Sequence, residues 1–82
     1  MFTSKEIYQL HKTTSKNIRS YRLAKNISQL ELALTIDIKS RTFFGNAENN
    51  TNGKHFNIEH IYKISKALDV SMVKLIESHP SV

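Results

Sequence analysis

SQLELALTIDIKSRTFFGNAE, residues Ser28–Glu48, decides the expected fold, because it predicts two short helices joined by a tight turn. Ser28 is placed to cap the first helix, and Glu31 three residues later completes a capping box. The apolar positions expected on this helix are Leu30, Leu32, Ala33 and Ile36. Residues 37–39 form the turn, from which Ile38 is expected to reach the core. The second helix is expected over residues 40–48.

The chain after this pair predicts one loop and two more helices. Residues 49–55 are polar and contain Asn52-Gly53, a strong turn signal. Asn57 is placed to cap an amphipathic helix, and Ser71 to cap a last short one. The apolar positions expected on the first of these helices are Ile58, Ile61, Ile64, Ala67 and Leu68. Those expected to pack inward on the second are Met72, Leu75 and Ile76.

The N-terminal third predicts two helices separated by an interruption. Ser4 is expected to cap a short helix that runs to about His11, with Ile7 and Leu10 on one side. Residues 13–15 interrupt it, and Ser15 caps a helix that runs to about residue 25. Residues 1–14 are therefore expected to be an N-terminal extension, residues 15–77 the main domain and residues 78–82 a tail. No segment alternates like a strand, so the expected fold is all-α, with five helices and an extra short N-terminal helix.

Composition excludes several classes of protein. The chain has 82 residues, the size of one small domain, and no cysteine, so neither a disulfide framework nor a thiolate metal site is expected. Four scattered histidines (His11, His55, His60 and His79) lack the spacing of a metal site. No catalytic constellation stands out, and we expect neither an enzyme nor a cofactor. No apolar run reaches the ~18 residues of a membrane span, and the N-terminus lacks a signal peptide, so a cytoplasmic protein is expected.

Positive charge is concentrated in the first half of the chain. The net charge is +5; residues 1–41 hold eight Lys or Arg against three acidic residues, whereas residues 42–82 hold four of each. Such an asymmetry favours an anionic partner, nucleic acid first and a membrane surface second. An ordinary solvated basic surface is the alternative.

Three short motifs, in this order and spacing, carry a family resemblance. They are Ile18-Arg19-Ser20-Tyr21-Arg22, the pair Ser28-Gln29 with Leu32-Ala33, and Ile64-Ser65-Lys66-Ala67-Leu68-Asp69-Val70-Ser71. Over residues 15–77 the chain resembles the helix-turn-helix domain of Cro/cI-type repressors, the XRE family of bacterial regulators. The resemblance implies a five-helix phage-repressor-like fold that binds double-stranded DNA.

Two departures from the family pattern bear on the turn. Asp37 stands where the family has Gly, and aspartate tolerates the left-handed conformation better than most residues. The glutamate of the family's third helix would fall on Ala47 by plain counting, yet the glutamate here is Glu48. We therefore infer one extra turn residue near Lys39. This register makes Ser40 the N-cap and buries Phe44 and Ala47, whereas the ungapped register would bury Asn46.

The resemblance implies a set of DNA contacts. The helix at 40–48 would enter the major groove, with base contacts from Arg41, Thr42 and Asn46. Contacts to the DNA backbone would come from Gln29, Ser40, Asn49, Lys54 and His55. Arg19 and Lys25 would add to the positive field without touching DNA. The alternative for the base-contact residues is that they are ordinary solvated side chains. The alternative for Asn49, Lys54 and His55 is a disordered polar loop, and Gln29 could serve only to cap its own helix.

The sequence also singles out a possible ion pair and two unusual residues of the third helix, Gly45 and Phe43. The resemblance implies a structural salt bridge between Arg22 and Glu48, which would hold the third helix to the first; the alternative for Arg22 is a phosphate contact. Gly45 in mid-helix would be explained by a close approach of DNA or another helix, or by a helix irregularity. Phe43 could pack under the N-terminal helix or touch thymine methyl groups.

The family resemblance and the positive charge together predict a sequence-specific regulator of transcription, of the repressor type, that acts as a homodimer. Candidate dimer residues are Met72, Val73, Ile76 and Val82 in one group and Phe2, Ile7, Tyr8 and Leu10 in the other. The second group lies in the N-terminal helix, which could pack on its own core or on a protein partner. The alternative function is an antitoxin-like or other protein-interaction module with secondary DNA binding. A membrane-surface domain is disfavoured because the apolar helix faces are needed for the core.

Overall fold

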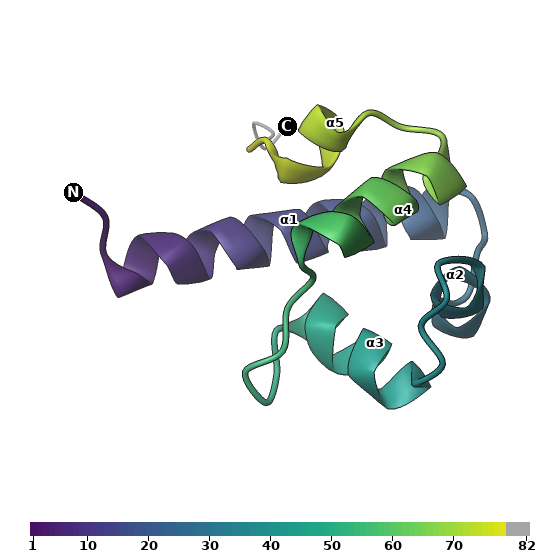
Figure 1. Ribbon diagram of the computed structural model, residues 1–82. Coiled ribbons are helices and arrows are strands. Elements are labelled where there is room, and N and C mark those ends of the chain that lie inside the picture. Colours follow the sequence, from purple (N-terminus) through teal and green to yellow (C-terminus); the bar gives the residue numbers. More distant parts are fainter. Residues whose placement is uncertain (79–82) are drawn as a thin grey trace.

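The computed structural model describes residues 1–78, and within them every regular element is an α-helix (Figure 1). The five helices are α1 Ser4–Ala24, α2 Gln29–Thr35, α3 Arg41–Asn49, α4 Ile58–Leu68 and α5 Met72–Ile76. The all-α fold with five helices expected from the sequence is confirmed. His79, Val82 and all of the expected tail except Ser78 lie outside the described residues.

Side chains cap the helices where the sequence predicts it. Ser28, Ser40, Asn57 and Ser71 each accept a hydrogen bond from the backbone N–H three residues later. The Glu31 carboxylate accepts in return from the N–H of Ser28, which completes the predicted capping box. These four caps are confirmed. They orient α2 to α5 at their starts.

The expected break at residues 13–15 is wrong, because α1 runs without interruption for 21 residues. Its N-cap is Thr3 rather than Ser4. The Thr14 hydroxyl donates to the carbonyl of Leu10, four residues earlier, at 3.0 Å. The Ser15 hydroxyl donates to the Ala47 carbonyl of α3 at 2.9 Å. Both hydroxyls thus find acceptors without ending the helix, so there is no separate N-terminal helix.

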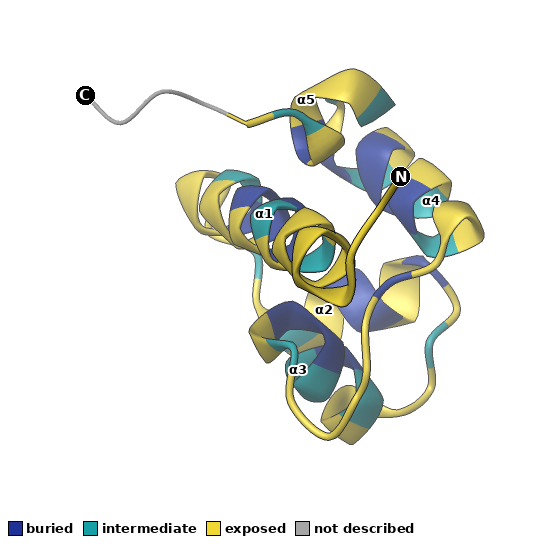
Figure 2. Cartoon of the chain, turned by 90° about the vertical axis from the view of Figure 1, so that its left-hand side faces the viewer, coloured by how far each residue is buried: buried dark blue, intermediate teal, exposed yellow. Residues whose placement is uncertain are grey.

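The core lies between α1 and the other four helices (Figure 2). Its buried apolar residues are Ile18, Leu32, Ala33, Ile36, Phe44, Ala47, Phe56, Ile61, Ile64, Leu68 and Leu75. The rings of Phe44 and Phe56 meet edge to face with centroids 5.1 Å apart. Phe56 ends the loop after α3, and the sequence analysis did not place it in the core.

Three residues expected in the core are exposed instead. Leu30 is 47% exposed, Ile58 70% and Ile76 39%. On α2 the buried face is defined by Leu32 and Ala33, and Leu30, two residues before Leu32, points to nearly the opposite side of the helix from Leu32, because successive residues turn about 100° around a helix. Ile58 is the first residue of α4 and lies at its open end. An apolar side chain at a helix end or on an outer face gains little burial.

The first half of α1 projects beyond the rest of the domain (Figure 1). Residues 1–10 are all exposed, among them Ile7, Tyr8 and Leu10. Viewed along α1, these turns form an uncovered end in front of the core (Figure 2). The apolar side chains of this segment are thus not packed on the domain's own core.

Candidate nucleic-acid interface

The turn between α2 and α3 has the conformation that the sequence predicts. Asp37 adopts a left-handed conformation with φ 63°, and the N–H of Ile38 donates to the Ala33 carbonyl at 2.8 Å. Ile38 is half-buried against the core. Beyond it, Phe44 and Ala47 are buried, which confirms the register with one extra turn residue.

Arg22 and Glu48 form a buried ion pair that ties α3 to α1. Arg22 Nη2 lies 2.8 Å from Glu48 Oε1, and Arg22 Nε donates to Glu48 Oε2 at 2.9 Å. The two side chains are only 8% and 0% exposed. Arg22 Nη1 donates to the Ile27 carbonyl at 2.8 Å, so all three guanidinium nitrogens have an acceptor inside the protein. The pair implied by the family resemblance is present, and the Arg22 side chain is buried in this contact rather than turned toward a phosphate.

Gln29, at the first position of α2, is drawn into the same network. Its amide nitrogen donates to Glu48 Oε1 at 3.0 Å. An amide nitrogen carries two donor hydrogens, so one remains for another acceptor, such as a DNA phosphate. Gln29 therefore does more than cap its own helix: it links the start of α2 to the end of α3.

Gly45 lies beside Gln29. A Cβ added to Gly45 would come 3.6 Å from the Gln29 side-chain oxygen, an ordinary van der Waals distance. The backbone of Gly45 does not have a positive φ, unlike that of Gly53 at φ 68°. Neither packing against Gln29 nor a positive φ thus requires glycine at this position.

The residues expected to contact bases lie along the outer side of α3. Arg41 and Thr42 are exposed in its first turn, and Asn46 is half-buried one turn further on. The Asn46 side-chain oxygen accepts from the Thr51 hydroxyl at 2.8 Å, which holds the amide in one orientation. A fixed amide can present both its donor and its remaining acceptor capacity to a base edge.

The residues expected to contact the DNA backbone lie around α3. Ser40 is the exposed N-cap, and Asn49 and Lys54 are exposed in the last turn of α3 and in the loop. The loop turns at Asn52 and Gly53, which both have positive φ. His55 is also exposed on one side, but its ring stacks on His11 of α1, with centroids 3.8 Å apart. This stack could not be predicted from the sequence, because the two residues are far apart in the chain.

Phe43 lies beside His60, an arrangement that neither sequence alternative included. The two ring centroids are 5.6 Å apart, and Phe43 is half-buried against the core. His60 also accepts at Nδ1 from the N–H of Asn57, as part of the cap of α4. The His60 ring at the start of α4 therefore contacts the Phe43 ring of α3.

Partial burial lowers the pKa of two histidines. The pKa of His11 lies below its ordinary 6.5, first because of burial and then because of the charge of His55. Burial likewise lowers the pKa of His60, with Lys63 lowering it further and Glu59 opposing the shift. Both histidines are therefore more readily neutral in the folded protein than in the unfolded chain.

Stability is expected to fall as the pH is lowered through the range just below 6.5. Folding lowers the pKa values of His11 and His60, so at a pH just below 6.5 the unfolded chain binds more protons than the folded protein. The free energy of unfolding therefore has its full value above pH 6.5 and decreases as the pH is lowered. Melting curves between about pH 8 and about pH 5 measure this. In the double variant His11→Gln/His60→Gln, the decrease should be smaller; glutamine can still serve the α4 cap. An equally steep decrease in the variant would assign it to other groups.

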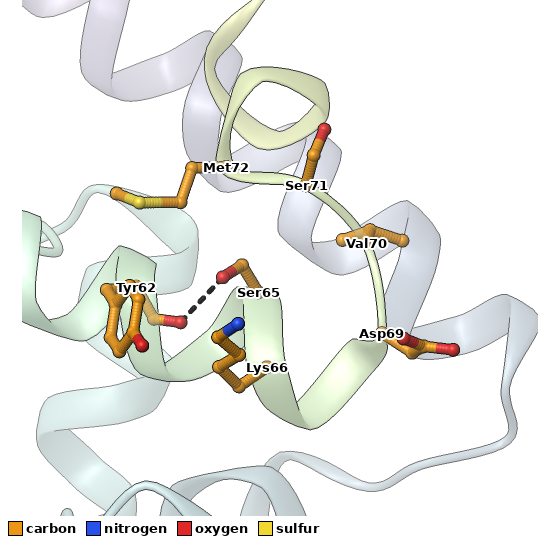
Figure 3. A pocket seen from close by; sticks show the side chains of 7 residues that line it. All are labelled: Tyr62, Ser65, Lys66, Asp69, Val70, Ser71 and Met72. Carbon is orange, nitrogen blue, oxygen red and sulfur yellow. Dashed lines mark hydrogen bonds between the residues drawn. The ribbon is translucent and has the colours of Figure 1, made fainter.

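A hollow of about 310 Å³ lies at the junction of α4 and α5, away from α3 (Figure 3). The Ser65 hydroxyl in its wall donates to the Tyr62 carbonyl at 2.6 Å. The Lys66 ammonium lies 5.5 Å from the centre of the Tyr62 ring. These polar groups have partners within α4, and the hollow brings together no group of reactive side chains.

Residues 1–78 contain neither a cluster of metal-binding side chains nor a helix that could span a membrane. No three His, Cys, Asp or Glu side chains in this part of the chain come together as metal ligands would. None of its helices has the length and apolar character needed to cross a bilayer. The residues expected to contact DNA, by contrast, lie along and around α3.

Comparison with known proteins identifies this arrangement. A family model described as helix-turn-helix matches residues 18–75, which include α2, the turn, α3 and α4. No curated protein and no solved structure matched the chain. The matched segment covers more than half of the 82 residues and contains the buried pair and the turn described above. The chain therefore belongs to the Cro/cI-type, or XRE, helix-turn-helix family of DNA-binding regulators.

Proposed function

We propose that this protein is a sequence-specific regulator of the repressor type, which binds double-stranded DNA as a homodimer and reads the major groove with α3. The observation that carries the proposal is the buried pair of Arg22 and Glu48, extended to Gln29. This network holds α3 at a fixed angle to α1 and α2, and it leaves the first turn of α3 exposed. A rigidly held, exposed helix start is what major-groove recognition requires.

Each side chain has a stated role in the proposal. Arg41 makes a bidentate contact to guanine, Asn46 does so to adenine, and the methyl group of Thr42 contacts thymine. The remaining amide hydrogen of Gln29 donates to a phosphate next to the start of α2. The other phosphate contacts come from Ser40, Asn49, Lys54 and His55. These contacts to the DNA backbone fix the position of α3 on the duplex, and so determine which bases its side chains reach.

A homodimer would place two copies of α3 in successive major grooves. The half-sites would lie about 34 Å apart, one turn of DNA. Two exposed apolar regions are available for the contact: Val73 and Ile76 on α5, and Ile7, Tyr8 and Leu10 on α1. If the protein binds as a homodimer, the bound DNA site should be pseudo-palindromic.

A second candidate function rests on the exposed first half of α1. Its apolar side chains have no cover within the described part of the chain, and an antitoxin-like module would use such a helix to bind its protein partner. DNA binding would then be secondary. This candidate predicts weak DNA binding with little preference for sequence.

Selection of bound DNA from a random pool tests the function. We expect an enriched site with two related halves. The logarithm of the affinity for this site should fall linearly with the logarithm of salt concentration, with a slope of about 0.9 for each phosphate contacted. Random DNA of equal length is the control. A pool without enrichment would favour the second candidate, and an affinity insensitive to salt would contradict binding through phosphates.

A further inference from the structure

One face of α1 carries a row of lysine and arginine residues that the helix-turn-helix does not account for. Lys5, Lys12, Lys16 and Arg19 follow one another at intervals of seven, four and three residues, which places them on the same side of a helix. All four are exposed. Within residues 1–78 no acidic side chain forms an ion pair with any of them.

Three of these residues line a groove against the end of α3. The groove has a volume of about 230 Å³, and Lys12, Lys16 and Arg19 form its α1 side. Residues 48–50 form the opposite side. Glu48 is the acidic residue of the groove, but its carboxylate is fully buried and paired with Arg22. The charge that the groove presents to solvent is therefore positive.

The groove shares Asn49 with the proposed DNA interface and lies close to two other residues of that interface. Glu48 in its wall accepts the hydrogen bond from Gln29, which we propose to be a phosphate anchor. On the α1 side, Lys12 is next to His11, whose ring stacks on His55 of the loop. The groove thus adjoins residues proposed to contact the DNA backbone. The helix α5 lies on the other side of α1 from α3 (Figure 1).

We propose that this groove binds consecutive phosphates of one DNA strand, so that α1 extends the interface beyond the helix-turn-helix. Arg19, expected from the sequence only to add to the positive field, then contacts DNA directly. This inference rests on the proposed function. From Lys12 to Arg19 the helix rises about 10.5 Å. Successive phosphates of one strand are about 3.4 Å apart along the duplex axis, so this length covers about three intervals between phosphates. The three cations that line the groove are therefore spread over a length sufficient to contact consecutive phosphates.

The test compares two variants with the same change in net charge. Lys12→Gln/Lys16→Gln/Arg19→Gln removes the cations of the groove, and Lys63→Gln/Lys66→Gln/Lys74→Gln removes three cations from α4 and α5. Dissociation constants are measured over a series of salt concentrations, on the selected site and on random DNA. Melting curves of both variants establish that they are folded.

We expect the groove variant to lose about 2.7 from the slope of log affinity against log salt, which is three contacts at 0.9 each. Its affinity should fall by a similar factor on selected and random DNA, because phosphate contacts carry no base preference. The α4 and α5 variant should retain nearly the slope of the unaltered protein. Single replacements at Lys12, Lys16 and Arg19 should each account for about a third of the loss.

Three results would overturn the inference. Equal slopes for the two triple variants would mean that the cations act only through the overall charge. A lower melting temperature with an unchanged slope would mean that they serve the C-terminal end of α3, where cations are favourable. If the unaltered protein binds no DNA at all, the proposed function fails and the inference fails with it. If the unaltered protein binds DNA and the two triple variants have equal slopes, the proposed function stands and only the inference about the groove is overturned.

Discussion

Glu48→Ala is expected to destabilise the domain by about 3–5 kcal/mol, because it leaves the Arg22 guanidinium buried without its partner. The loss is large for a domain of this size, since native stabilities are about 5–15 kcal/mol. Gln29 would also lose the acceptor of its side-chain hydrogen bond. Chemical denaturation and thermal melting both measure the effect.

Two controls separate the buried pair from ordinary surface charge. Glu59→Ala removes an exposed glutamate from the first turn of α4 and should change stability by no more than about 0.5 kcal/mol. Arg22→Met/Glu48→Leu replaces both charges with apolar groups and should recover much of the loss, because no unpaired charge stays buried. An unchanged melting curve for Glu48→Ala would rule out the pair as a stabilising contact.

Arg41→Ala and Asn46→Ala are each expected to remove discrimination at one base pair, by about 1–3 kcal/mol. In affinity this is roughly 5- to 150-fold between the preferred and the wrong base at that position, since 1.4 kcal/mol corresponds to a factor of ten. Arg41 is exposed and lies outside the buried network, so its loss should leave the fold intact. Asn46→Ala also frees the Thr51 hydroxyl, and its melting curve should be recorded alongside.

Lys54→Ala is the matched control for these two variants. It removes a proposed phosphate contact from the exposed loop and should weaken binding to all sequences by the same factor. Selection of bound DNA with each variant distinguishes the two patterns. If Arg41→Ala or Asn46→Ala instead lowers affinity equally on selected and random DNA, that residue contacts phosphate and not a base.

Much of the local structure could be predicted because its causes are local. A helix cap joins a side chain to a backbone N–H three residues away, so Ser28, Ser40 and Asn57 could each be identified from a short window. The left-handed turn at Asp37 follows from the same kind of short-range chemistry. The register of α3 followed from a comparison with the family pattern and the cost of burying Asn46.

The missed features depend on residues that are distant in the chain. Ser15 has the composition of a helix start, yet its hydroxyl donates to Ala47, 32 residues away, and α1 continues through it. His11 and His55 stack only because the loop after α3 folds back on α1. Neither contact has a signal in any short window of the sequence.

For this protein the sequence by itself determined the helices after α1, their caps and the family, because these follow from short-range hydrogen bonds and from motif spacing. The tertiary structure decided which polar groups act inside the protein and which remain for a partner. The Gln29 side-chain amide donates one hydrogen bond to Glu48 and keeps a second donor hydrogen for a partner. Lys12, Lys16 and Arg19 of α1 line a groove only because α3 ends beside them. Such choices depend on which acceptors and charges packing brings within a few ångströms, and that distance is set by the whole fold.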